Sequence, residues 1–450
     1  MTLERAPLAP NPVICAAFGH CGIGIGAEAY RWILIDVGAD PRRPTLKGEK
    51  EQIHVLRRYG GTVLRFGVPY KKAELPLVPR ALLIDLDPRA ANLILQSYPE
   101  LFAMKDKHAL YGMGGAARNW AEGRSRFRNE IETKYDVQRR FEELSPEPVR
   151  GFNIPFAMGG GTGGAFASAF MEHVKNTSGG TQVMATIGVI PEFGWDPVIL
   201  GPASISIVMN LDYQIKYADM PMLIDNKALR NLAARFGNDL SKRSSIVDEL
   251  PEELEIGWRD YRNMNLIPAH VMSLFVASFT RETEWDMSNY RTWLASSKPR
   301  FVYPWLIPVV PKESDIEGIL NSLSEARDGV LFDFEGEEPS RMVGEKGSCC
   351  VLVKARGKFE HEHRERLRKI IKERFPTEDK RIIFIRIPCL GGEPGGVLVL
   401  LNNKAMGSKI LSIAKEAEDA WDGYKAEYER WGLKQEEFKQ SLINVVNHFS

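Results

Sequence analysis

Residues 158–165 read Met-Gly-Gly-Gly-Thr-Gly-Gly-Ala, and five glycines around one threonine cannot serve to fill a core. Glycine lets the backbone come close to a bound group and point several N–H donors at one spot. The segment follows an apolar run, 152–158, and leads into a small, apolar stretch from Ala165 that predicts a buried helix. Free N–H groups and the helix dipole favour negative charge at such a place, so the segment predicts a phosphate site that includes the Thr162 hydroxyl.

A glycine-rich surface turn is the alternative interpretation of this segment. Three consecutive glycines between apolar stretches lose much chain entropy on folding, which is unfavourable unless a close approach requires them. The segment is not a Walker-type loop, because no lysine follows the glycines and G-x-x-x-x-G-K-[ST] occurs nowhere in the chain.

The first half of the chain alternates short apolar strands with helical stretches, which predicts a parallel, doubly wound sheet. Strands are predicted over 13–18, 81–84 and 183–190, and helices are predicted from Ala27 and over 263–279. The second half predicts a mixed sheet in an α+β domain, with strands over 300–307, 348–353, 381–387 and 397–401. A pair of amphipathic helices is predicted over 408–449.

These patterns divide the chain into four parts. We expect a ligand-binding domain over 1–260, a central helix over 261–280, an α+β domain over 281–403 and C-terminal helices over 404–450. The length of 450 residues, with 44% hydrophobic and 26% charged residues, suits a globular protein with two cores.

The charge and the cysteine content limit which binding partners and which cellular compartment are expected. Lys plus Arg and Asp plus Glu each number 59, so the net charge gives no indication of binding to nucleic acid or anionic lipid. No apolar run reaches the length that spans a membrane, and the first residues lack the pattern of a signal peptide. The five cysteines show no metal-binding spacing. We therefore expect a cytoplasmic protein with no nucleic-acid partner and no membrane insertion.

A second glycine-rich segment, 19–26, follows the first predicted strand. Both glycine-rich segments lie between a strand and a helix, so both are expected at the carboxyl edge of one sheet, where α/β folds bind ligands. Gly22 to Ala27 alone also fits the fingerprint G-x-G-x-x-[GA], which leaves a nicotinamide-dependent oxidoreductase as an alternative. Such an enzyme needs only one glycine-rich loop, whereas this chain has two.

Polar residues at other predicted strand ends are candidates for the same site. Asp85 and Asp87 end a strand and could hold Mg²⁺ beside phosphates, although turn chemistry before Pro88 explains them equally well. A third small-residue turn, 111–120, carries Arg118 and Asn119 as candidate phosphate contacts.

Several motifs, in the same order along the chain, resemble the tubulin/FtsZ superfamily on its tubulin side. Residues 158–165 resemble the signature loop GGGTG[ST]G, and 19–26 resemble GQCGNQIG. The other similar stretches are 78–88 (VPRA(I/V)LVDLEP), 119–123 (NWAKG), 224–229 (IDNEAL) and 431–445 (the terminal helices). The chain is thereby identified as a divergent, tubulin-like member from a prokaryote or an archaeon.

The resemblance implies a fold, a ligand and a set of binding residues. The fold is α/β, with a Rossmann-like, parallel-sheet GTPase domain, a long central helix, a smaller α+β domain and a C-terminal helical pair. The ligands are GTP or GDP with Mg²⁺, and Asp85 and Asp87 lie near the metal. The implied GTP-binding residues are His20, Cys21, Gly22, Arg118, Asn119, Gly160, Gly161, Thr162, Gly163, Asn226, Tyr261 and Asn265. Among these, Asn226 and Asn265 contact guanine and Tyr261 stacks on it.

The resemblance also implies GTP hydrolysis between subunits, with acids supplied by a loop of the next subunit. Asp286 fits the aspartate of that loop and Glu284 is its partner, while Asn289 stands where the family has its catalytic acid. An asparagine cannot act as a base, so slow or absent hydrolysis is an open alternative. Arg118 and His20 replace family residues near the phosphates, and Gly201 stands where tubulins have a ribose-binding glutamate.

We therefore expect a cytoskeletal GTPase of the cytoplasm that polymerises head-to-tail into protofilaments. The expected partners are further copies of the chain or a second tubulin-like subunit. The alternatives are a polymer-forming or regulatory protein that binds GTP with little hydrolysis, and the oxidoreductase named above.

Overall fold

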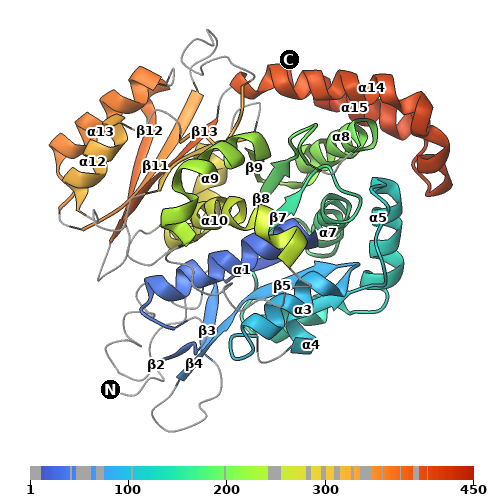
Figure 1. The fold of residues 1–450 in the computed structure, drawn as a ribbon, viewed down its shortest axis with the longest axis horizontal. Coiled ribbons are helices and arrows are strands. Elements are labelled where there is room, and N and C mark those ends of the chain that lie inside the picture. The colour runs from blue at the N-terminus through green and yellow to red at the C-terminus, as the bar shows by residue number, and fades with distance from the viewer. Residues whose placement is uncertain are drawn as a thin grey trace.

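Six parallel strands form the main sheet, in the order β6-β5-β1-β7-β8-β9 (Figure 1). Their bounds are β1 Val13–Phe18, β5 Ala81–Asp85, β6 Ala109–Tyr111, β7 Gly151–Ala157, β8 Val183–Ile190 and β9 Met220–Asp225. The computed structural model describes residues 12–40, 43–46, 62–66, 75–102, 105–196, 199–241, 255–279, 285–294, 300–308, 315–325, 329–334, 347–356, 358–374, 377–388, 395–402 and 404–450.

The strand order reverses between β1 and β7. From β1 the chain moves outward through β5 to β6, and it then returns to β7 on the other side of β1 and continues to β8 and β9. Helix α1 (Gly19–Asp36) follows β1 directly, and α7 (Gly163–Thr177) follows β7. Open α/β sheets bind ligands at such a reversal, outside the carboxyl ends of the strands.

Alternate residues of β1 enter two different cores, as expected for a parallel strand that is covered on both faces. One set, which includes Cys15, packs with α1 and with α10 (Glu255–Ala277). The other set, which includes Ala16, packs with α7 and with α8 (Leu200–Tyr217). The main sheet therefore lies between two helical layers.

A second, mixed sheet of four strands has the order β10-β13-β11-β12. Its strands are β10 Tyr303–Pro308, β11 Gly347–Ala355, β12 Thr377–Pro388 and β13 Gly396–Asn402. Only β11 and β12 pair in parallel, and α12 (Ile316–Glu325) packs on α13 (His361–Arg374) beside them. Helix α10 contacts α1 and three strands of this sheet, so it joins the two parts of the molecule (Figure 1).

The remaining elements lie around these two sheets. A small sheet has the order β2-β4-β3, formed by β2 Thr45–Leu46, β4 Leu75–Pro79 and β3 Leu64–Phe66. The other helices are α3 Pro88–Ser97, α4 Lys105–His108, α5 Trp120–Arg126, the π-helix η2 Phe127–Glu132, α6 Val137–Leu144, α9 Asn226–Ser241, α11 Met287–Trp293 and the short 3-10 helix η5 Lys404–Met406. No helix in the described ranges is both long and apolar enough to cross a membrane.

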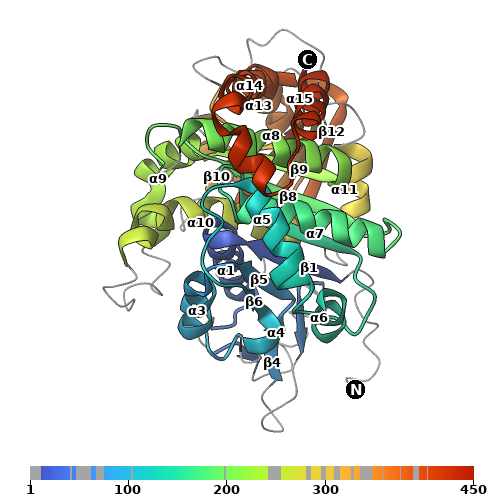
Figure 2. The same cartoon turned by 90° about the vertical axis from the view of Figure 1, so that its right-hand side faces the viewer.

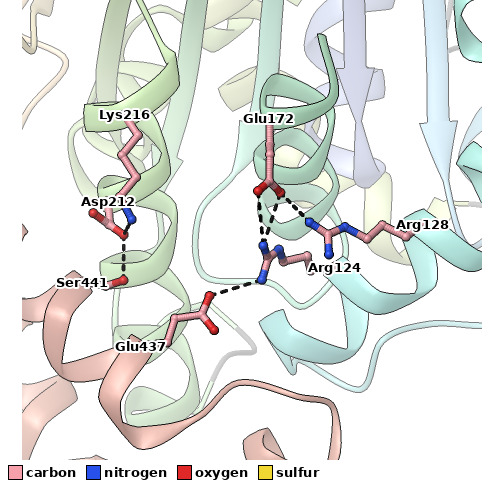
Figure 3. A network of polar contacts seen from close by, with 7 residues as sticks. All are labelled: Arg124, Arg128, Glu172, Asp212, Lys216, Glu437 and Ser441. Atoms are coloured by element: carbon pink, nitrogen blue, oxygen red, sulfur yellow. Dashed lines mark hydrogen bonds and ion pairs between the residues drawn. The ribbon is translucent and has the colours of Figure 1, made fainter. Parts of the chain in front are cut away.

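Two C-terminal helices, α14 (Gly407–Arg430) and α15 (Gln435–Phe449), lie at the opposite end of the molecule from the small sheet (Figures 1 and 2). Both pack on α8. In Figure 3, Arg124 of α5 lies between Glu437 of α15, at 3.2 Å, and Glu172 of α7, at 3.3 Å. Asp212 of α8 accepts a 2.7 Å hydrogen bond from the Ser441 hydroxyl of α15. These contacts attach α15 to the helices that follow the main sheet's binding loops.

The α/β fold expected from the sequence is confirmed, with its parallel sheet, central helix, mixed second sheet and C-terminal helical pair. Two helix starts were predicted too late: α10 begins at Glu255 rather than at residue 263, and a helix was expected from Ala27, but α1 begins at Gly19, immediately after β1. Gly19 makes the turn in a single residue with φ at 68°, a conformation that favours glycine. The glycine-rich segment is therefore the first two turns of a helix.

Candidate functional site

The two glycine-rich segments meet at the reversal of the main sheet. A Cβ atom added to Gly19 would lie 3.0 Å from the Cα atom of Gly163, so α1 and α7 begin side by side. The N-cap residues of these helices, Phe18 and Thr162, supply no side-chain hydrogen bond to the first turn. The N–H groups of two adjacent helix ends are thus available to an anion, and the helix dipoles favour negative charge there.

Three other helices in the same domain begin differently, although α8 also lacks a side-chain cap. Asp87 caps α3, Asn119 caps α5 and Asp136 caps α6, each by accepting a hydrogen bond from a backbone N–H of the first turn. Side-chain capping of this kind is the usual way to satisfy the first N–H groups of a helix. Its absence at both α1 and α7, whose starts lie side by side, leaves two sets of N–H groups directed at one place, which suits a phosphate.

Gly160 and Gly161 are neighbours in residues 158–165, called the signature segment below, but they have different surroundings. A Cβ atom on Gly161 would lie 2.6 Å from both the Ala116 oxygen and the Asn119 nitrogen, so no larger residue fits there without a shift. A Cβ atom on Gly160 would meet nothing within 4 Å. Gly161 is therefore needed for packing against residues 116–119, whereas Gly160 borders open space into which a ligand can enter.

The turn that contains Arg118 lies against this segment in a strained conformation. Ala117 and Arg118 have φ values of 41° and 68°, in the left-handed region that non-glycine residues rarely adopt. Arg126 stabilises the turn by donating hydrogen bonds to the carbonyl oxygens of Met113 and Gly115. Arg118 itself is exposed and makes no hydrogen bond or ion pair with the described part of the chain. Its guanidinium group is thus free to bind an anion at the loop.

Asn119 is buried, with an exposed fraction of 1%. Its oxygen accepts the 3.1 Å capping bond from Glu122, while its side-chain nitrogen is buried without a hydrogen-bond partner in the described structure. An orphaned donor beside an anion site is consistent with a role in binding, because a buried unpaired donor is unfavourable until a ligand accepts from it.

Asp85 and Asp87 lie next to α1, with His20 between them. The Nε2 atom of His20 is 3.7 Å from one oxygen of each carboxylate. Asp85 is buried, and its Oδ2 atom has no hydrogen-bond partner in the described ranges. Burial raises the pKa of Asp85 to about 6, although the charge of His20 opposes this shift. Asp87 is occupied differently, since it caps α3 and forms an ion pair with Arg89 at 2.5 Å.

These residues fit Mg²⁺ in part. The orphaned Asp85 oxygen is the kind of hard ligand that Mg²⁺ prefers. Within the described ranges, however, no group of three or more His, Cys, Asp or Glu residues could hold a metal by itself. A magnesium ion there would need phosphate oxygens and water as its other ligands, which is how Mg²⁺ is commonly bound beside nucleotides.

A polar cluster forms where a base would be expected. Asp196, in the loop after β8, accepts hydrogen bonds from the Asn226 side-chain nitrogen at 3.0 and 3.2 Å and from the Tyr261 hydroxyl at 2.7 Å. Asn265 is buried one turn beyond Tyr261 on α10 and therefore lies on the same helix face. The structure thus brings Asn226 and Tyr261 together through a common partner, Asp196.

Asp196 was not among the residues singled out from the sequence. It lies 30 residues from Asn226 and 65 from Tyr261, and no local motif marks it. The one available signal was its position, because it follows a predicted strand at the carboxyl edge of the sheet. Cys21 lies close enough to Asp196 for the charge of the carboxylate to act on its thiol. Burial, and then this charge, raise the pKa of the Cys21 thiol to about 12.

Asn210 of α8 is a second residue that the sequence did not reveal. Its nitrogen donates to the Met158 carbonyl at 2.7 Å, and its oxygen accepts from Trp120 at 2.8 Å and from Ser168 at 3.0 Å. The side chain is fully buried. It therefore fixes the start of the signature segment to α5 and α7.

Gly22, which was expected to bind the nucleotide, and Gly201 both lie where other parts of the chain pack closely. A Cβ atom on Gly22 would lie 2.1 Å from the Pro155 oxygen, so α1 packs directly on the β7 backbone. A Cβ atom on Gly201 would lie 2.7 Å from the Tyr424 ring of α14. Gly201 therefore packs closely against the C-terminal helix α14.

Asp286 lies at the other edge of the main sheet. It precedes α11, whose Met287 sulfur is 2.6 Å from a Cβ atom built on Gly151, the first residue of β7. Asp286 accepts from the Asn289 N–H at 3.0 Å, and the Asn289 side chain accepts from the Asp286 N–H at 2.8 Å, which completes a capping box. Glu284, its predicted partner, lies outside the described residues.

Comparisons with known proteins agree with this geometry. Residues 12–234 match the family described as Tubulin/FtsZ family, GTPase domain. The chain is 25% identical to a tubulin beta chain of Aspergillus fumigatus over 262 residues, which are 58% of this chain and 52% of that protein. It is 27% identical to a tubulin beta chain of Encephalitozoon cuniculi over 300 residues, covering 62% of this chain and 63% of that protein.

A nucleomorph tubulin beta chain of Guillardia theta is 27% identical over 225 residues, which cover 50% of this chain and 48% of that protein. The chain thus spans about half to just under two thirds of the length of these relatives. The matched region contains the main sheet, both glycine-rich segments and the Asp196–Asn226 contact. The chain is therefore a tubulin-like member of the Tubulin/FtsZ superfamily.

Proposed function

We propose that the protein binds GTP and GDP with Mg²⁺ at the carboxyl edge of its main sheet. The observation that carries this proposal is the pair of adjacent helix N-termini, α1 and α7, that lack side-chain caps. In this proposal the backbone of Gly160 to Gly163 binds the phosphates, Arg118 and Asn119 bind phosphate oxygens, and the Tyr261 ring, Asn226 and Asn265 bind the base.

A magnesium ion bound with the nucleotide would neutralise charge that develops on the phosphates during hydrolysis. Asp85 is the residue best able to hold it, because its buried oxygen is not otherwise used. Asp87 would contribute less, since Arg89 and the first turn of α3 already occupy its carboxylate. His20, 3.7 Å from both acids, would remain beside the site.

We further propose that the protein assembles head-to-tail in the cytoplasm as a cytoskeletal filament. This assembly proposal is supported by the positions of the candidate acid, Asp286, and of the candidate nucleotide site, which lie at opposite edges of one sheet. A contact between unlike faces does not close on itself, so it propagates into a filament. The next subunit, either another copy or a second tubulin-like chain, would then bring Asp286 to the phosphates to orient water.

A protein that polymerises with little hydrolysis is the second candidate function. The capping box favours it, because Asp286 already accepts a hydrogen bond from the Asn289 N–H and Asn289 cannot act as a base. The oxidoreductase alternative has lost its support, because Gly22, Gly24 and Gly26 lie inside α1 rather than in a turn before it.

Sedimentation and phosphate release, measured in the same tubes, test both proposals. The full chain is incubated with Mg²⁺ and GTP, GDP or a non-hydrolysable GTP analogue over a range of protein concentrations. We expect polymer with GTP and phosphate release that rises more steeply than the protein concentration. Polymer without phosphate release would favour the second candidate, and a folded protein that binds neither GTP nor GDP would refute the proposed site.

A further inference from the structure

Asp196 is a buried carboxylate that neutral groups surround. Its exposed fraction is 8%, and it makes no ion pair with a Lys or Arg of the described ranges. Its four hydrogen bonds come from the Glu192 N–H, the Tyr261 hydroxyl and, to both oxygens, the Asn226 side-chain nitrogen. Burying an ion without a counter-ion is unfavourable, so a role that needs a group that only accepts hydrogen bonds would account for it.

The chemistry of the contact fixes the orientation of the Asn226 amide. An ionised carboxylate can only accept, so the NH₂ group of Asn226 must face Asp196. The amide oxygen then points away from Asp196 and is left as an acceptor for a ligand. Guanine carries donors at N1 and at its 2-amino group, which match such an acceptor.

The loop that carries Asp196 is attached on both sides of the cluster. Glu192 forms an ion pair with Arg230 of α9 at 2.6 Å. The Arg230 guanidinium lies 5.7 Å from the centre of the Trp195 ring, and that ring is 5.4 Å from the ring of Tyr261. Asp196 is therefore held in place relative to α9 and α10, so it can impose an orientation on Asn226.

We propose that Asp196 is a positioning residue that sets the purine preference of the site, by holding the Asn226 amide with its oxygen toward the base. This inference rests on the proposed nucleotide site. Without the carboxylate, the amide can rotate by half a turn and present its NH₂ group instead. A donor there would oppose the 2-amino group of guanine and suit xanthine, which has an oxygen at that position.

The test compares GTP with xanthosine triphosphate on the full-length protein, by equilibrium binding with Mg²⁺. For Asp196→Asn we expect the preference for GTP over xanthosine triphosphate to fall about tenfold or more, since unmatched polar groups in a binding site discriminate at this level. Asp196→Ala, which removes the carboxylate altogether, should also lower the preference for GTP over xanthosine triphosphate. It replaces Asp196→Asn in the test if that variant does not fold. Circular dichroism establishes folding for each variant.

Asp219→Asn is the control for loss of a buried carboxylate away from the proposed base. Asp219 also accepts a backbone hydrogen bond, from Met184 at 2.9 Å, but it lies just before β9, beside the start of β8, and it forms ion pairs with Lys175 and Arg291. We expect no change in the nucleotide ratio for this variant. An equal loss of both nucleotides in the folded Asp196 variants would overturn the inference while leaving the proposed function intact. A folded wild-type protein that binds neither nucleotide would refute the proposed function itself.

Discussion

The starts of α1 and α7 at the carboxyl edge of the main sheet differ from the start of α11 at its amino edge. At the carboxyl edge, α1 and α7 begin without side-chain caps, and Asp85 and Asn119 each bury a polar atom with no partner in the described structure. At the amino edge, α11 begins with a complete capping box. Unsatisfied groups are unfavourable in a folded protein unless a ligand uses them. The contrast indicates that the paired starts of α1 and α7 are built to bind a ligand, whereas the start of α11 is complete in itself.

The largest expected effect concerns Asp286 at the amino edge. Asp286→Ala and Asn289→Ala each remove one half of the same capping box, so each should lower the free energy of unfolding by about 1 kcal/mol. Only Asp286→Ala should also slow assembly-dependent phosphate release, by about 100-fold or more, because it removes the acid proposed to orient water.

Steady-state phosphate release and urea unfolding measure the two effects for this pair. GTP affinity of the unassembled protein should be unchanged in both variants, since the site at the carboxyl edge is intact. Equal slowing by the two substitutions would assign the loss to the cap and not to catalysis.

The next effect separates two adjacent glycines at the carboxyl edge. Gly161→Ala should destabilise the protein by about 1–3 kcal/mol, because its new methyl group would overlap with residues 116–119. Gly160→Ala should leave the unfolding free energy within about 0.5 kcal/mol, since its methyl group would enter open space. It should nevertheless weaken GTP binding about tenfold to 100-fold, through lost hydrogen bonds to charged oxygens.

Equilibrium GTP binding and urea unfolding distinguish the two variants. Normal GTP affinity in Gly160→Ala would mean that the open space beside the segment is not where a phosphate binds.

A smaller effect is expected at Arg118, whose φ of 68° strains its backbone. Arg118→Gly should relieve that strain and raise the unfolding free energy by about 0.5–1 kcal/mol. It should also weaken GTP binding about tenfold and GDP binding much less, because among the phosphate oxygens we assign those of the terminal phosphate to the Arg118 guanidinium. Arg126→Ala is the comparison, since it releases the whole turn and should weaken both nucleotides.

Thermal or urea unfolding with GTP and GDP titrations gives all of these values. Equal weakening of GTP and GDP by Arg118→Gly would contradict a contact to the terminal phosphate.

The smallest effect is expected at a glycine remote from both edges. Gly423 lies within α14, and a Cβ atom there would meet nothing within 4 Å. Gly423→Ala should raise the unfolding free energy by about 0.5–1 kcal/mol in urea, because alanine loses less entropy in a helix. Nucleotide binding should not change. A loss of GTP affinity would contradict this prediction, because it would show that α14 influences the nucleotide site.

Local patterns were sufficient to predict much of the fold. The strands β1 and β8 were predicted at their observed bounds, because each is an apolar run that ends at Gly19 or Pro191. The start of α1 was not predicted, since the glycines in its first turns have low helix propensity, and the close packing of Gly22 on β7 and of Gly26 on β1 is seen only in the structure. Tertiary packing here overrides the local preference.

The candidate site was predictable only where a motif is continuous in the sequence. The signature segment marks itself by its glycines, whereas Asp196 acquires its role from partners on α9 and α10. Asn210 likewise acts through contacts with three separate elements. The capping box explains Asp286 and Asn289 locally, which is a structural role that the family resemblance alone did not reveal.

The most direct test of the account mixes two variants that are each defective at one edge. Gly160→Ala should bind GTP poorly but supply a normal Asp286, and Asp286→Ala should bind GTP normally but supply no acid. At a GTP concentration too low to fill the Gly160→Ala site, each variant alone should release little phosphate. We expect the mixture to release phosphate faster than the sum of the two, because Gly160→Ala subunits complete the sites of Asp286→Ala subunits. Phosphate release equal to that sum, in a mixture that sediments as polymer, would contradict a site shared between the two edges.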